Sequence, residues 1–200
     1  MKAKILLFIC LFLLAKMNFS QNIIQERDLT DYEQALELIG VKEFKFDFKN
    51  MCKNGKIKLY IDEIKIDSVL QHKEFVFNLS RVKNLKENVL KVFSFTQADT
   101  SSFLKIKLIH PSMAVSLPLN MKGSNSEPHI WKCFEIGKLE YDKKVPLLLY
   151  GSMWDDEFNG QKIKRFCWGT DLKRDMSNVE LKKIPHMIVL GYELVKTESE

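Results

Sequence analysis

Strict alternation of apolar and polar residues over strand-length segments is the feature that most constrains this fold. Phenylalanines and charged residues alternate over residues 43–49, and isoleucine, leucine and lysine alternate over residues 56–61. A period of two buries one face of each segment and leaves the other in solvent. The phase of the second run slips at Asp62-Glu63, which predicts a β-bulge or a change of sheet. The Asn54-Gly55 pair between the two runs predicts a hairpin turn.

Similar segments recur along the chain and are separated by clusters of Asn, Asp, Ser, Gly and Pro. About ten strands with little helix between them predict an all-β, mainly antiparallel fold, a two-sheet β-sandwich. An open β-barrel is the alternative. A parallel α/β fold is disfavoured because its crossovers need helices. The further candidate strands span residues 74–79, 89–96, 103–109, 113–119, 130–136, 145–153, 163–168 and 187–195.

One short helix is expected before the first strand. Thr30-Asp31-Tyr32-Glu33 fits a capping box, in which the Thr30 and Glu33 side chains satisfy backbone donors of the first turn. Apolar residues continue on one face as far as Ile39, and Gly40 can adopt the positive φ of a helix stop. The helix is therefore predicted to end at Gly40 and to pack against the strands that follow.

The N-terminus has the anatomy of a cleavable signal peptide. Lys2 and Lys4 precede an unbroken apolar run over residues 5–15, which is shorter than the roughly 20 residues of a membrane span. Cleavage after Ser20 is predicted, and an uncleaved N-terminal anchor is the alternative. We therefore expect residues 1–20 to be a signal peptide and residues 21–200 to form one domain without a stable membrane anchor. The protein would be exported, and its location would be periplasmic, on the cell surface or extracellular.

The charge of the mature chain argues against a nucleic-acid partner. Residues 1–20 contain three lysines and no acid, so cleavage lowers the net charge from +5 to +2. The remaining lysines alternate with apolar residues along the candidate strands and do not form a basic run. The electrostatic footprint of a nucleic-acid-binding protein is therefore missing.

Three cysteines remain after cleavage, in a compartment where disulfides form. Cys133 and Cys167 lie in strand-like segments and could pair as a disulfide, whereas Cys52 lies beside the Asn54-Gly55 turn and is the expected exposed thiol. Three thiols without a bridge are the alternative, because free cysteine packs as a small hydrophobe. The sequence has no C-x-x-C pair, and we predict neither a metal site nor a cofactor.

The acidic stretch before Gly160 is the most suggestive candidate site. Asn159-Gly160 predicts a type I′ hairpin turn with the acids at its tip, and Trp154 is expected near solvent. The stretch also resembles the start of a calcium loop, but Phe166 stands where the bidentate glutamate belongs. The predicted ligand-binding residues are Trp154, Asp155, Asp156, Glu157 and Asn159.

The expected function is that of an exported, non-catalytic β-sandwich that binds a protein or carbohydrate partner or has a structural role in the cell envelope. The sequence lacks a G-x-S-x-G elbow, an H-E-x-x-H motif and a phosphate-binding glycine loop. The loop over residues 123–129 is a second candidate contact surface. A secreted hydrolase that acts on glycans and a calcium-stabilised extracellular module are the alternatives. The four histidines are far apart in the sequence, at positions 72, 110, 129 and 186.

Overall fold

A computed structural model of the chain describes residues 36–48, 55–66, 68–78, 88–96, 103–111, 113–120 and 128–196. The predicted signal peptide, the Thr30–Glu33 capping box, Cys52 and residues 123–127 lie outside these residues. A helical turn over residues 36–38 ends at Gly40, whose φ is +81°. The predicted helix stop at Gly40 is therefore confirmed, because a positive φ favours glycine.

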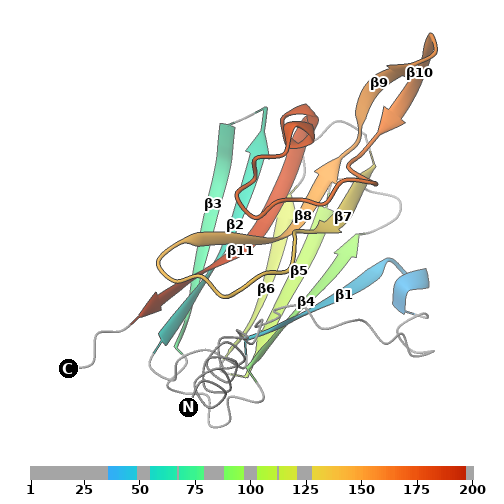
Figure 1. The fold of residues 1–200 in the computed structure, drawn as a ribbon. Helices are drawn as coiled ribbons and strands as arrows, with labels where there is room; N and C mark the ends of the chain where they lie inside the picture. Colours follow the sequence, from blue (N-terminus) through green and yellow to red (C-terminus); the bar gives the residue numbers. More distant parts are fainter. Residues whose placement is uncertain are drawn as a thin grey trace, which may run out of the picture.

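The described residues form two main antiparallel sheets and a separate hairpin (Figure 1). The predicted all-β sandwich is therefore confirmed, and the sheets do not close into a barrel. One sheet contains, in spatial order, β1 (Val41–Asp47), β4 (Val89–Thr96), β5 (Phe103–His110) and β6 (Met113–Asn120). The other contains β3 (Ser68–Asn78), β2 (Gly55–Lys65), β11 (His186–Lys196), β8 (Lys144–Ser152) and β7 (His129–Cys133). The hairpin consists of β9 (Trp154–Phe158) and β10 (Gln161–Arg165), and a 3-10 helix, η3 (Val179–Lys183), precedes β11.

The predicted hairpin at Asn54-Gly55 is wrong, because β1 and β2 belong to different sheets. β1 pairs with β4, with Phe46 opposite Leu90, and the chain then crosses to the second sheet. A local turn signal cannot reveal such a crossover. A bulge is present where the phase of β2 slips, but its extra residue belongs to β3: Glu63 and Ile64 pair with Gln71 and Val69, which leaves Leu70 unpaired. The register of β2 with β11 is unbroken through the same residues.

The main core lies between the two sheets and consists of the inward residues of each strand. Phe48 and Tyr192 contact each other edge to face there, with ring centroids 5.3 Å apart. At the opposite end of the sandwich, Phe44 of β1 contacts Trp131 of β7 at 5.4 Å. The fully buried residues of this core include Phe46, Ile57, Leu59, Leu90, Val92, Leu104, Ile106, Leu108, Leu148, Ile188, Leu190 and Leu194.

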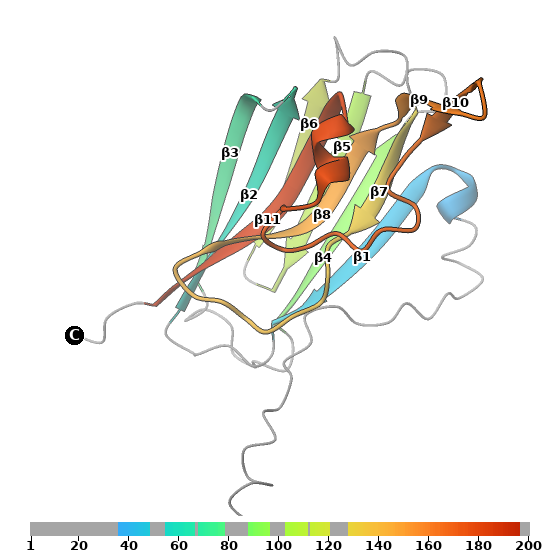
Figure 2. The ribbon, with the colours of Figure 1, turned by 45° about the horizontal axis from the view of Figure 1, so that its top comes forward.

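A second core covers the outer face of the five-stranded sheet. Leu149 and Val189 point away from the first core and pack against the chain between β10 and β11, including Leu172 and Ile184. Figure 2 shows this segment crossing the face of β11 and β8. Every residue of β8 after Lys144 is buried, as expected for a strand covered on both faces.

A second bulge interrupts the pairing of β8 with β11 at Leu190/Gly191. Pro146, which has no N–H to donate, lies opposite Gly191 at this irregularity. A Cβ on Gly191 would lie 2.3 Å from the Tyr60 hydroxyl oxygen and 2.5 Å from the Val145 carbonyl oxygen. Glycine at this position therefore allows Tyr60 to lie against the backbone of β11.

A buried polar contact closes the core at one end of the four-stranded sheet. His110 Nε2 lies 2.5 Å from Asn88 Oδ1, and Asn88 Nδ2 donates to the Phe48 carbonyl oxygen at 3.0 Å. Asn88 and His110 are both buried. Burial lowers the pKa of His110 to about 4, because the charged imidazolium is poorly solvated there.

Acidification is expected to destabilise the protein through His110. In the unfolded chain this imidazole takes up a proton near its ordinary pKa of 6.5, whereas in the folded protein it does so only near 4. Between these values the unfolded state binds more protons, so stability falls as the pH falls, by about 2–3 kcal/mol near pH 4.5. Urea unfolding near pH 7 and near pH 4.5 measures how much unfolding free energy is lost on acidification. This loss should be smaller for His110→Gln than for the wild type. Equal losses in the two proteins would contradict this assignment.

Candidate functional site

The β9–β10 hairpin stands outside both sheets and extends beyond the sandwich (Figures 1 and 2). Asn159 and Gly160 have φ values of +51° and +76°, which confirms the predicted hairpin turn. Lys164 Nζ lies 2.8 Å from Asp155 Oδ1, and Arg165 Nε lies 3.0 Å from Asp156 Oδ2. These contacts join the two strands and restrict their relative motion.

The carboxylates of the hairpin do not converge on a common point. Asp155 and Asp156 contact cations of β10, and Asp156 Oδ1 also accepts a hydrogen bond from the Glu157 amide at 2.9 Å. Across the described residues, no three His, Cys, Asp or Glu side chains gather so that they could hold a metal ion. The hairpin therefore presents paired charges, and its geometry gives no support to a calcium loop.

The expectation that Trp154 lies near solvent is wrong. Its side chain is only 8% exposed and packs in the second core with Phe166 and Leu149. Trp154 begins β9 directly opposite Arg165, at the root of the hairpin, and its Nε1 is buried without a hydrogen-bond partner. The indole therefore fixes the hairpin to the sandwich through apolar contact.

Among the described residues, two other aromatic rings are exposed. Phe158, beside the hairpin turn, is 57% exposed, and Trp168, which follows β10, is 66% exposed. Trp168 contacts Phe166 edge to face, with ring centroids 5.7 Å apart. One side of the indole is therefore held by Phe166 while the rest faces solvent. Sequence reasoning missed Phe158, although its place next to Asn159-Gly160 was a usable signal.

A row of polar side chains crosses the inner face of the five-stranded sheet at the hairpin end. His129, Ser152, His186 and Glu63 come from β7, β8, β11 and β2. Each lies two residues along its strand from a side chain of the main core, so each points between the sheets. His129 lies directly opposite Ser152. The four strands therefore place these groups together at one end of the sandwich, where Ser152 and His186 are buried.

Three of these groups form a hydrogen-bonded chain. His186 Nε2 lies 2.9 Å from Glu63 Oε1, and His186 Nδ1 lies 2.9 Å from His129 Nε2. The Glu63 carboxylate can only accept, so Nε2 of His186 carries a proton. When His186 is neutral, its Nδ1 accepts a hydrogen bond from the Nε2–H of His129. The arrangement fixes the tautomers and connects a carboxylate with His129 across β11.

His186 is buried, and an aromatic ring lies against His129. The His186 side chain is 4% exposed, and its backbone amide donates to Ser152 Oγ at 3.2 Å. The Tyr150 ring lies 5.2 Å from the His129 ring, and burial raises the pKa of Tyr150 to about 12. Both ring nitrogens of His186 are occupied, so neither can take the proton of Ser152. The row is a hydrogen-bonded chain, and it does not assemble a serine nucleophile.

The predicted disulfide between Cys133 and Cys167 is absent, and both thiols are free. Cys133 packs against the core between the sheets, whereas Cys167 lies in the second core on the outer face. The two side chains therefore lie on opposite sides of the five-stranded sheet. Burial raises the pKa of both thiols, which lowers the fraction present as nucleophilic thiolate.

A surface hollow of about 480 Å³ lies at the end of β7. Its lining includes the two carboxylates Glu135 and Asp171, together with Ile136 and Leu172. The Glu135 amide donates to the Leu172 carbonyl oxygen at 2.8 Å, which joins the two segments. Both carboxylates are exposed to solvent. They therefore lack the contrasting environments that distinguish the acid from the base in a glycan hydrolase.

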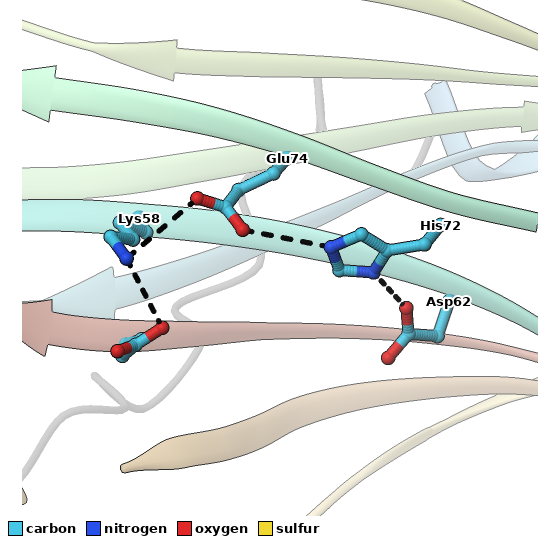
Figure 3. A network of polar contacts seen from close by, with 5 residues as sticks. Lys58, Asp62, His72 and Glu74 are labelled. Atoms are coloured by element: carbon cyan, nitrogen blue, oxygen red, sulfur yellow. Dashed lines mark hydrogen bonds and ion pairs between the residues drawn. The ribbon is translucent and has the colours of Figure 1, made fainter. Parts of the chain in front are cut away.

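A second polar network lies on the outer face of β2 and β3 (Figure 3). His72 Nδ1 contacts the Asp62 carboxylate, and His72 Nε2 lies 3.6 Å from Glu74 Oε2. Lys58 Nζ lies 3.9 Å from Glu74 Oε1 and 3.6 Å from Glu193 Oε2. Such exposed ion pairs add little stability, so their main effect is to order the side chains along β3.

Comparison with known proteins gives a family match over nearly the whole chain. A family model described as a domain of unknown function matches residues 12–196, which include every described strand. No curated protein and no solved structure matches the chain. Within the described ranges, no helix has the length and apolar character needed to cross a membrane.

Removal of the Glu63 acceptor is expected to destabilise the sheet. In Glu63→Leu the Nε2–H of His186 loses its acceptor while remaining buried, which should lower the free energy of unfolding by about 1–3 kcal/mol. Glu63→Gln retains an acceptor oxygen, so its free energy of unfolding should fall clearly less than that of Glu63→Leu. Urea unfolding of both variants near pH 7.5 provides the measurement, and Glu157→Leu on the exposed hairpin is the control. Equal stability of Glu63→Leu and Glu63→Gln would show that the hydrogen bond contributes nothing.

Proposed function

The chain belongs to the family Domain of unknown function (DUF5041), and we propose that it is an exported, non-catalytic binding protein whose hairpin recognises a protein or carbohydrate partner. The observation that supports this proposal best is the β9–β10 hairpin with its exposed aromatic rings. Phe158 lies at the tip, and Trp168 lies just beyond the end of β10. Aromatic residues are enriched where proteins bind partners, because they offer a large contact area with few rotatable bonds.

The hairpin is suited to recognition because it is held at its root and exposed at its tip. Trp154 and Phe166 pack in the second core, while Asp155 and Asp156 pair with cations across the strands. A preorganised element loses less conformational entropy on binding than a flexible loop. The binding residues predicted from the sequence are therefore revised: Trp154 holds the element, and Phe158 and Trp168 supply the apolar contact.

Several reactive groups of the described residues are engaged in structural contacts. Cys167 is buried, Cys133 is partly buried, and both ring nitrogens of His186 are occupied. Asp155 and Asp156 of the hairpin contact lysine and arginine. These arrangements support a binding role better than an enzymatic one, because a catalytic group must be available to the substrate.

Export is the second part of the proposal and rests on the signal-peptide pattern. Lys2 and Lys4, followed by the apolar run over residues 5–15, should direct secretion with cleavage after Ser20. Mass spectrometry of the protein recovered from envelope and medium fractions should find a mature chain that begins near Gln21. An intact N-terminus in a protein that stays in the cytoplasmic fraction would contradict export.

Loss of the exposed rings is expected to weaken binding without affecting the fold. The mature protein is tested against peptidoglycan, surface polysaccharide and envelope-protein fractions from the producing cells, and the fraction with saturable binding is titrated. Phe158→Ser and Trp168→Ser should each weaken that binding by about tenfold or more, in the range of interface hot spots. Gln161→Ser, on the same hairpin, is the matched control. Unchanged affinity in both aromatic variants would exclude the hairpin as the contact.

A further inference from the structure

The outer face of the four-stranded sheet carries two phenylalanines that belong to neither core. Val92 of β4 and Ile106 of β5 are fully buried between the sheets, so the residues that alternate with them point outward. Phe93 and Phe95 are two such outward residues, and both are partly buried. Neither ring is a member of the core between the sheets or of the second core. This face therefore presents two large apolar rings on one strand.

A surface hollow of about 400 Å³ lies over these rings, and we call it the outer hollow. Its volume is within the range of small-molecule sites, about 300–1,000 Å³. β6 presents the small residues Ser116 and Pro118 outward here, opposite Lys107 and Lys105 of β5. Short side chains beside long ones leave a recess in the face of the sheet. The lining of the outer hollow includes Val41, Phe93, Phe95, Lys105, Lys107 and Pro118.

The charge on this face is predominantly positive. Lys105 and Lys107 lie directly opposite the two phenylalanines in the register of β4 with β5, and Lys91 lies one row further along β4. All three lysines are exposed. In the described rows that cross the outer hollow the acidic residue is Glu43, and its carboxylate lies 3.5 Å from Lys45 Nζ. The face is therefore complementary to a ligand that carries negative charge.

We propose that the outer hollow binds one molecule of a single-chain anionic amphiphile of the fatty-acid class. The hydrocarbon chain lies against Phe93, Phe95 and Pro118. The carboxylate contacts the ammonium group of Lys107, and the Ser116 hydroxyl beside it is a second donor. The methylene stems of the lysines extend the apolar wall while their charged ends stay in water. This occupant matches both the apolar lining and the positive charge.

The shape and chemistry of the outer hollow favour a single bound molecule over a lipid surface or a carbohydrate. Side chains that insert into a bilayer protrude from the protein, whereas Phe93 and Phe95 are partly buried and border a recess. The lining side chains that can form hydrogen bonds are serines and lysines. Such a set suits one anionic head group better than the many hydroxyl groups of a sugar.

The proposal is independent of what the hairpin binds. β9 and β10 follow β8 of the five-stranded sheet, whereas the outer hollow lies on the other sheet. The two sites can therefore be tested separately. Phe158→Ser, which is expected to weaken binding by the hairpin, should leave binding at the outer hollow unchanged.

Titration calorimetry of the full mature chain with laurate, near pH 8 and below the micelle concentration, tests the proposal. The wild type should bind one equivalent with saturation. Dodecyltrimethylammonium has a chain of similar length with a positive head group, and it should bind at least tenfold more weakly because it faces lysines. Absence of saturable laurate binding, or equal affinity for the two amphiphiles, would overturn the proposal. So would sedimentation with phosphatidylglycerol vesicles by a protein that does not bind monomeric laurate.

Two variants locate the bound molecule. Lys107→Glu reverses a charge on the exposed face, away from both cores, and should weaken laurate binding by about tenfold or more. Phe95→Ser removes apolar contact and should weaken it by a similar factor. Lys162→Glu makes the same charge change at an exposed position of β10 and is the matched control, with unchanged affinity expected. Wild-type laurate affinity in Lys107→Glu would overturn the assignment of the carboxylate to this face.

Discussion

Burial of both faces of β8 and β11 is the constraint on which the rest of this structure depends. One face packs against the four-stranded sheet, and the other packs against the chain between β10 and β11. Burying both faces removes far more apolar area from water than one sheet face could. It also requires 3-10 helix η3 and the segment before it to lie across the sheet. The hairpin is fixed to the same second core through Trp154 and Phe166, so its position follows from this packing.

The sequence predicts local structure well because alternation and turn chemistry are local properties. The strand pattern, the bulge in the β2–β3 pair, the stop at Gly40 and the Asn159-Gly160 turn are all present. Strand pairing is not local, and so the Asn54-Gly55 signal suggested a hairpin where the chain changes sheets. Trp154 was misplaced for a related reason: its position beside an exposed turn gives no sign of the core segment that covers it.

The candidate site could be predicted only in part. The hairpin and its acidic residues were found from the sequence, but the polar row was not. His186 lies 57 residues from His129 and 123 residues from Glu63, so only the strand order brings the three together. The predicted disulfide failed because Cys133 of β7 faces the core between the sheets, whereas Cys167 lies after the end of β10, in the segment that covers the outer face. The polar row and the positions of the two cysteines therefore depend on tertiary packing, which the local sequence pattern does not reveal.

The central claim is that the hairpin serves recognition while the two cores hold the fold. The direct test replaces residues 156–163 with an Asn-Gly turn, since Asp155 and Lys164 already lie opposite each other, and leaves Trp154 and Phe166 in place. Calorimetry and titration against the bound envelope fraction are then compared with the wild type. The account predicts an unfolding free energy within about 1 kcal/mol of the wild type and loss of binding. A shortened protein that binds with wild-type affinity, or one that no longer folds, would contradict it.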